Sequence, residues 1–128
     1  MKSKTKVLLA LAAAFGLGGA VVEGLHAQAK LKQVYIVGHI EVKDSDPYLK
    51  DYAPKAQALI RKSGGKILAA SSSPTQIEGK ALGSRAVVQL WPSMEQYKAY
   101  RSSAEFKEVR KLGDKYAKFN SVALEALD

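Results

Sequence analysis

The stretch RAVVQLWPSMEQ, residues 85–96, decides the fold because it contains a strand, the end of that strand and the start of a helix. Its first part is rich in β-branched and bulky apolar side chains, which suit a pleated sheet. Pro92 has no N–H to donate to a neighbouring strand, so the strand ends there. Ser93, followed three residues later by Gln96, forms a capping-box pattern. This pattern predicts that a helix begins at once.

The residues before this stretch predict a strand, a helix and a second strand. Residues 34–42 alternate between apolar and mixed side chains, as in a strand with one buried face. A helix is expected over residues 47–63, because it starts on a proline and ends before the glycine pair at 64–65. The second strand is expected over residues 66–70.

The residues after this stretch predict a helix in two parts and a final strand. A second capping-box pattern at residues 102–105 restarts the helix, which then continues to Tyr116. Residues 122–127 alternate again and are expected to form the last strand. The order strand, helix, strand, strand, helix, strand is the ferredoxin-like βαββαβ plan of the α+β class. It predicts a four-stranded antiparallel sheet with both helices on one face.

The second face of this sheet is predicted to be uncovered and partly apolar. The residues assigned to it are Tyr35, Val37, His39, Glu41, Val87, Gln89 and Trp91. Such a face is too apolar to remain in contact with water in a monomer, so we expect a second copy of the chain to cover it. The predicted assembly is a homodimer.

The N-terminal residues 1–29 have the pattern of a cleaved signal peptide. Three lysines precede an apolar and glycine-rich run over residues 7–22, and the sequence AQA at 27–29 suits signal peptidase. The alternative is an uncleaved anchor, but the run is shorter than the roughly 20 residues that a spanning helix needs. We therefore expect a single domain over residues 30–128 in the periplasm or outside the cell, without stable membrane insertion.

Composition excludes several classes of site. The chain has no cysteine, which excludes disulfides and a lipid-modified cysteine. Its net charge falls from +8 to +6 after cleavage, because the signal segment holds three lysines and Glu23. The remaining positive charges are spread over the helices without interleaved aromatic residues, so nucleic acid binding is not predicted. There is no clustered metal-ligand spacing and no glycine-rich phosphate loop in residues 30–128.

His39 is the candidate catalytic residue. It is the only histidine of residues 30–128 and shares a strand face with Glu41. By the predicted sheet order it lies near Arg85 or Gln89, and such a set in an apolar cavity suits acid–base chemistry or the holding of an anion. The alternative is a structural histidine whose hydrogen bonds are made to Glu41 or to a backbone carbonyl.

Five further side chains are candidates for ligand contact: Tyr35, Glu41, Arg85, Gln89 and Trp91. Arg85 suits bidentate binding of a carboxylate, and equally an interfacial ion pair with Glu41 or Glu125. Trp91 is favoured as an anchor in the dimer core over a stacking platform for a ligand, because it stands at a strand end beside Pro92.

Several short motifs, taken in order, resemble one bacterial family. They are Tyr35-Ile36-Val37, Asp44 with Tyr48 and Tyr52, Gly64-Gly65, Glu78-Gly79, Arg85-Ala86-Val87-Val88, Pro92-Ser93, and Ser102 with Phe106. With this set, residues 33–127 resemble the family catalogued as domain of unknown function 1330, within the dimeric α+β barrel superfamily. The family usually has glutamate and phenylalanine before its proline, where this chain has Leu90-Trp91. The resemblance implies a ferredoxin-like protomer whose sheet pairs with that of a second subunit.

Two functions from different classes agree with this resemblance. The first is an uncharacterised exported protein that binds a small, mostly apolar or anionic ligand, or serves as an accessory protein, with its cavity at the dimeric barrel. The alternative is a cofactor-independent oxygenase or isomerase with His39 as acid and base, which the superfamily implies by analogy. A purely structural interaction protein is a third reading. No cofactor and no metal are predicted, and whether the protein is an enzyme stays open.

Overall fold

The fold is known from a computed structural model that describes residues 31–128. The predicted signal segment, residues 1–29, lies outside the described residues. Within the described residues there is no helix with both the length and the apolar character needed to cross a bilayer.

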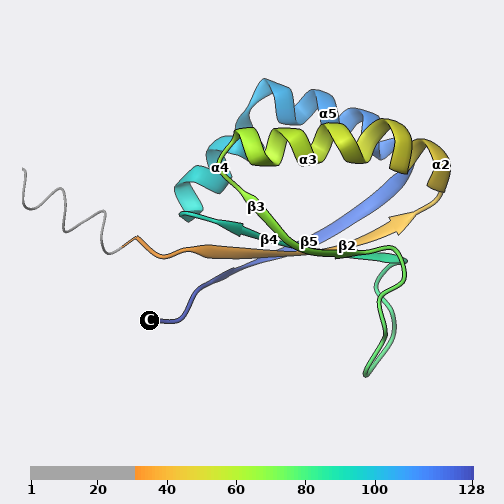
Figure 1. The fold of residues 1–128 in the computed structure, drawn as a ribbon, viewed down its shortest axis with the longest axis horizontal. Helices are drawn as coiled ribbons and strands as arrows, with labels where there is room; N and C mark the ends of the chain where they lie inside the picture. Colours follow the sequence, from red (N-terminus) through yellow and green to blue (C-terminus); the bar gives the residue numbers. More distant parts are fainter. Residues whose placement is uncertain (1–30) are drawn as a thin grey trace, which may run out of the picture. The chain divides into compact units, whose positions relative to one another are not determined.

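Four antiparallel strands form one sheet in the spatial order β3-β4-β2-β5. The strands are β2 (Val34–Val42), β3 (Lys66–Ser71), β4 (Arg85–Trp91) and β5 (Ala117–Glu125). The helices all lie on one face of this sheet, as Figure 1 shows. This is the predicted ferredoxin-like α+β fold, which is confirmed.

The helical layer contains five segments: α2 (Ser45–Pro47), η1 (Tyr48–Tyr52), α3 (Ala53–Lys62), α4 (Met94–Ser102) and α5 (Ala104–Asp114). The two-part second helix is confirmed, because α4 ends where α5 begins. Ser93 Oγ accepts a hydrogen bond from Gln96 N at the start of α4, at 3.1 Å. Ser103 Oγ accepts a hydrogen bond from Phe106 N at the start of α5, also at 3.1 Å.

The first helix contains a π-helical turn, η1, that the sequence analysis did not predict. Pro54 has no N–H, so it cannot make the normal bond to the carbonyl of Lys50. The N–H of Ala53 instead bonds to the carbonyl of Tyr48, five residues earlier. This turn places Tyr48 and Tyr52 side by side, with ring centroids 5.2 Å apart. Both tyrosines are buried.

The last strand starts earlier than the sequence predicts. The prediction was residues 122–127, whereas β5 spans Ala117–Glu125. The reason is that β5 pairs with the whole length of β2, from Ala117 opposite Val42 to Glu125 opposite Val34. Ala117 and Phe119 alternate with polar residues, but Ser121 on the helix side interrupts this alternation in the sequence.

The assignment of β4 to the two faces of the sheet was wrong. Directly opposite residues of antiparallel strands point to the same side, and Gly38 of β2 lies opposite Val87 of β4. Val34, Ile36 and Ile40 are buried beneath the helices. By this register, the residues of β4 on the helix side are Arg85, Val87, Gln89 and Trp91. A shift of one residue moves every side chain of a strand to the other face.

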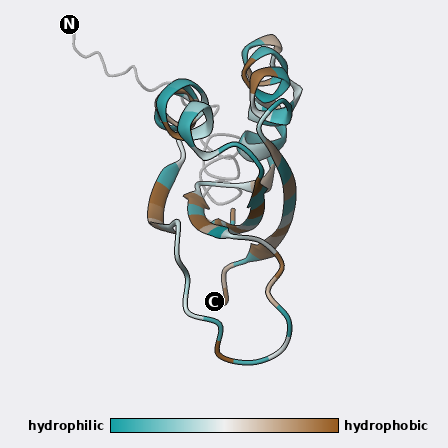
Figure 2. Ribbon diagram, turned by 90° about the vertical axis from the view of Figure 1, so that its right-hand side faces the viewer, coloured by the Kyte–Doolittle hydropathy of each residue, from teal (hydrophilic) through white to brown (hydrophobic). Residues whose placement is uncertain are grey.

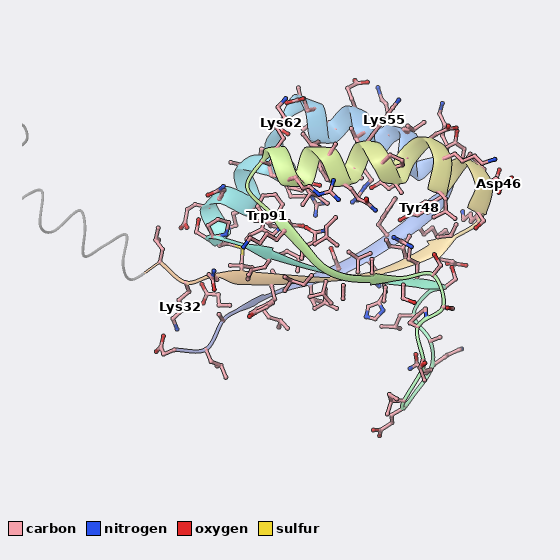
Figure 3. The ribbon with its side chains drawn as sticks, viewed as in Figure 1. Lys32, Asp46, Tyr48, Lys55, Lys62 and Trp91 are labelled. Carbon is pink, nitrogen blue, oxygen red and sulfur yellow. The ribbon has the colours of Figure 1, made fainter. Side chains whose placement is uncertain are left out.

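Trp91 is therefore part of the protomer core and not an anchor in a dimer interface. None of its surface is exposed, and its ring packs against Tyr100 at 4.7 Å between centroids. Figure 3 shows Trp91 and Tyr48 in the layer between the sheet and the helices, toward opposite ends of the sheet. Each belongs to one of two buried clusters.

The open face of the sheet remains partly apolar after this correction. By the strand register it carries Tyr35, Val37, His39, Glu41, Ala86, Val88, Leu90, Lys118, Asn120, Val122 and Leu124. More than half of the surface of Val122 and of Leu124 is exposed. The loop over residues 72–84 extends away from the sheet on this same side in Figures 1 and 2. Ile77 and Leu82 of the loop are also exposed.

Gly65 tests the packing around Trp91. A Cβ added at Gly65 would lie 2.6 Å from two ring carbons of Trp91, whereas one added at Gly38 meets nothing nearer than 3.9 Å. We predict that Gly65→Ala lowers the free energy of unfolding by about 1–3 kcal/mol, because the core is overpacked. Gly38→Ala is the matched control, and its free energy of unfolding should be unchanged or slightly higher. Urea denaturation measures both, and equal stability of the two variants would contradict this packing.

Candidate functional site

A cavity of about 80 Å³ lies inside the protomer, between the sheet and the helices. Gly38 of β2 and Val87 of β4 form part of its floor, and Ala53, Ala56 and Ile60 of α3 form part of its roof. Gly38 contributes no side chain there, which keeps the space above it open. The cavity thus depends on a glycine in the middle of a strand, a position where side chains normally fill the core.

Three arginines from separate elements line the cavity. Arg85 comes from β4, Arg101 from α4 and Arg110 from α5. Arg85 Nη1 donates a hydrogen bond to Ser72 Oγ at 2.8 Å. The guanidinium of Arg110 stacks on the ring of Phe119, 3.9 Å from the centroid. These contacts hold both guanidinium groups in place at the cavity wall.

The positive charge of these arginines is not balanced within the cavity. Its lining contains no aspartate or glutamate. The ion pairs in residues 31–128 lie elsewhere, between Lys32 and Asp128 and between Lys62 and Glu105. Within residues 31–128 of one protomer, Arg85 makes no ion pair with Glu41 or Glu125, and the interfacial pair between protomers stays a prediction.

Two donors in this region have no acceptor. The Nε atoms of Arg85 and Arg110 are both buried, and neither makes a hydrogen bond. A buried donor without a partner costs about 1–3 kcal/mol, more when it is charged. An anion in the cavity would supply the missing acceptors and the missing negative charge.

The buried tyrosines of the cavity act as neutral phenols. Burial raises the pKa of Tyr48, and the positive charge of Arg85 beside it offsets this in part. Burial also raises the pKa of Tyr52, offset in part by Arg110. The pKa of Tyr100 is raised for the same reason. At neutral pH the three hydroxyl groups are protonated and available as hydrogen-bond donors.

The structure divides the residues that the sequence analysis proposed for the site. Arg85 and Gln89 line the cavity, and Trp91 is buried beside it. His39, Tyr35 and Glu41 point to the open face of the sheet instead. The strand neighbours of His39 are Ala86 on β4 and Asn120 on β5. His39 therefore shares no cavity with Arg85 or Gln89, whereas Glu41 lies on its own face of β2, and its catalytic role stays a prediction.

The residues that the helices contribute were not among the predicted site residues. They include Tyr48, Tyr52 and Arg110. A signal for Arg110 was present, since it lies four residues after Phe106 and so shares its buried helix face. An arginine on the apolar face of a helix places its charged group toward the core of the protein.

Comparison with known proteins gives a family and a fold. A family model described as "Domain of unknown function (DUF1330)" matches residues 33–127. No curated protein matches the chain. Within residues 31–128, no three histidine, cysteine, aspartate or glutamate side chains come together as a metal site would require.

Several solved structures share the fold at low sequence identity. A protein of unknown function from Rhodopseudomonas palustris is 12% identical, with a TM-score of 0.61 over 85% of this chain and 93% of that one. SnoaB, a cofactor-independent oxygenase from Streptomyces nogalater, is 11% identical, with a TM-score of 0.55 over 76% and 95%. A putative antibiotic biosynthesis monooxygenase from Nitrosomonas europaea is 12% identical, with a TM-score of 0.51 over 75% and 92%. Such identities establish a common fold and nothing about activity.

The raised pKa values of the cavity tyrosines predict a loss of stability at high pH. The unfolded chain ionises its tyrosines from about pH 10, before the folded chain does, because the pKa of Tyr48, Tyr52 and Tyr100 is higher when folded. The stabilising contribution is therefore complete below pH 10 and is lost as the pH rises above it. We predict that the free energy of unfolding falls less between pH 8 and 11 in Tyr48→Phe and in Tyr52→Phe than in the unchanged protein. Urea denaturation at each pH measures it.

Tyr116→Phe is the matched control for this experiment. It removes one hydroxyl group from a tyrosine that does not line the cavity. Identical pH profiles for all three variants and the unchanged protein would contradict the assignment of buried neutral phenols to the cavity.

Proposed function

We propose a function for this chain, which belongs to the DUF1330 family, a domain of unknown function. Each protomer binds a small organic anion in the cavity between its sheet and its helices. This places the ligand within one protomer, whereas the sequence analysis expected it in the space between two sheets. Two protomers pair through their open sheet faces and leave both cavities accessible.

The observation that carries this proposal is the pair of buried Nε atoms, on two half-buried arginines, that have no hydrogen-bond acceptor. Arg85 and Arg110 each hold a buried Nε donor that has no acceptor, in a cavity whose lining has no carboxylate. Buried charges in proteins are normally paired or bound to a ligand of opposite charge. A carboxylate or a similar anion would satisfy both donors, since guanidinium groups bind planar anions through parallel hydrogen bonds.

The remaining walls indicate the rest of the ligand. Ile36, Ile40, Ile60, Ile67, Val87 and Phe106 line the cavity with apolar surface. The volume of about 80 Å³ is smaller than the roughly 150 Å³ cavity that takes benzene in another protein. A short aliphatic acid fits this description, and a single-ring acid fits with small movements of the lining.

Pairing of the open sheet faces is proposed from their composition. Val37, Val88, Val122 and Leu124 form an apolar strip across three strands, and water covers it in a single protomer. Exposed apolar patches of this kind mark protein interfaces. A second copy is the natural occupant, because Glu41 and Lys118 on the same face supply both signs of charge for self-complementary contacts.

Location and chemistry complete the proposal. The signal pattern of residues 1–29 supports export to the periplasm or beyond.

The alternative function, a cofactor-independent oxygenase or isomerase, draws support from the fold likeness alone. In that alternative Tyr48 and Tyr52 would donate hydrogen bonds to the substrate as neutral phenols, because His39 lies on the other face of the sheet.

Binding of a simple acid tests the cavity. We predict that hexanoate binds the protein in isothermal titration calorimetry, and that Arg85→Met or Arg110→Met weakens binding by about 10- to 100-fold, the range expected for a charge-assisted hydrogen bond. Gly38→Val should abolish binding, because its side chain fills the floor of the cavity. Circular dichroism checks that each variant is folded.

Arg61→Met is the matched control, because Arg61 is an exposed arginine of α3 outside the cavity. It should leave binding unchanged. The proposal would be refuted by an absence of carboxylate binding in the unchanged protein, or by equal weakening in the Arg61 and Arg85 variants.

Sedimentation tests the dimer. We predict that residues 30–128 sediment as a dimer at micromolar concentration, and that Val122→Glu weakens dimerisation at least about tenfold by placing a charge in the apolar strip. Ala58→Glu adds the same charge on the exposed surface of α3 and should have no effect. A well-folded monomer at this concentration would contradict the pairing of sheets.

A further inference from the structure

Gln89 has a fixed orientation at the cavity wall. Trp91 Nε1 donates a hydrogen bond to Gln89 Oε1 at 2.8 Å. An indole nitrogen can only donate, so the atom of Gln89 that faces it must be the oxygen. The ambiguity that usually attends an amide side chain is thereby removed. Trp91 acts as a positioning residue for Gln89.

The amide nitrogen of Gln89 is left as a donor. Its oxygen is occupied by Trp91, and the nitrogen makes no hydrogen bond to another group within residues 31–128. Gln89 is half-buried and lines the cavity. The cavity therefore presents a neutral donor at Gln89 in addition to the charged donors of Arg85 and Arg110.

These donors are separated along the sheet. Gln89 and Arg85 lie on the same face of β4, four residues apart, which corresponds to about 13 Å between their Cα atoms. Val87 lies between them and is apolar. A ligand that meets both groups has its anionic group and its second polar group several bonds apart, with an apolar segment between.

The second polar group must accept hydrogen bonds and must not be a cation. The amide nitrogen of Gln89 donates only. Three arginines line the cavity without a carboxylate, so a ligand ammonium would meet like charges and no counter-ion. A carbonyl oxygen satisfies Gln89 without adding a donor that needs an acceptor.

We infer that the cavity binds oxo acids, which are carboxylates with a carbonyl several carbons away, in preference to the amino or hydroxy acids of the same skeleton. This inference rests on the proposed function and adds the chemical class of the ligand. The carboxylate lies between Arg85 and Arg110, and the carbonyl oxygen accepts from the Gln89 amide.

Calorimetry with a matched set of acids tests this inference. The set consists of hexanoate, 5-oxohexanoate, 5-hydroxyhexanoate and 5-aminohexanoate, with 3-oxo and 4-oxo acids to vary the spacing. At least one oxo acid should bind about three- to tenfold more tightly than both its parent acid and 5-hydroxyhexanoate, as one added neutral hydrogen bond implies. The amino acid should bind at least about tenfold more weakly than hexanoate, because its ammonium group is desolvated without a partner.

Variants of Gln89 separate the carbonyl contact from the anion contact. Gln89→Leu should remove the preference for the oxo acid, so that the oxo acid binds no more tightly than hexanoate. Gln89→Glu keeps an acceptor for Trp91 but turns a second oxygen to the cavity, so it should favour the amino acid over the oxo acid. Trp91→Phe should reduce the oxo-acid preference without a matching loss of hexanoate affinity, because the amide is then able to turn.

The outcomes distinguish the inference from the function on which it rests. Equal affinity for hexanoate and every oxo acid would overturn the inference and leave the anion site standing. An oxo-acid preference that survives in Gln89→Leu would also overturn it. Failure of every acid in the set to bind would overturn both. Should Gln89→Glu fail to fold, as judged by circular dichroism, Gln89→Leu decides the question.

Discussion

The antiparallel register of β2 against β4 is the constraint on which the rest of the structure depends. With Gly38 opposite Val87, Arg85, Gln89 and Trp91 lie beneath the helices. The same register assigns His39 to the open face. A slip of one residue by β4 would turn Trp91 to the open face, and a slip by β2 would turn His39 under the helices. Burial of Trp91 opposes such a slip, because the ring is fully enclosed and packs against Tyr100 and Gly65.

The helices complete the site that this register begins. The π-helical turn η1 brings Tyr48 and Tyr52 together above the strands, and α5 supplies Arg110. Aromatic rings hold the guanidinium groups, with Phe119 beneath Arg110 and Tyr48 beside Arg85. Cation–π contacts compensate part of the desolvation cost but supply no hydrogen-bond acceptor. The protomer thus keeps a positively charged cavity, whereas charges in the interior of a protein are normally paired.

The two faces of the sheet consequently serve different purposes in our proposal. The helix-covered face contains the cavity with its donors, and the open face contains the apolar strip that a second copy covers. Strand alternation makes this division possible, because adjacent residues of β2 such as Gly38 and His39 contribute to different faces. Changes on one face are therefore separable from changes on the other, provided that the register is kept.

The sequence by itself determined the order of elements and the fold class, because strand alternation, helix caps at Ser93 and Ser103, and the glycine stop after α3 are local signals. It also proposed Arg85 and Gln89 as site residues, and both line the cavity of the structure. It did not determine which face of β4 meets the helices, since alternation gives two sets without saying which is inside. Only tertiary structure decided this, through the pairing of strands, and it alone brought Arg110 and Tyr52 from distant helices to the same cavity. Such contacts depend on the packing of whole elements and leave little trace in local sequence.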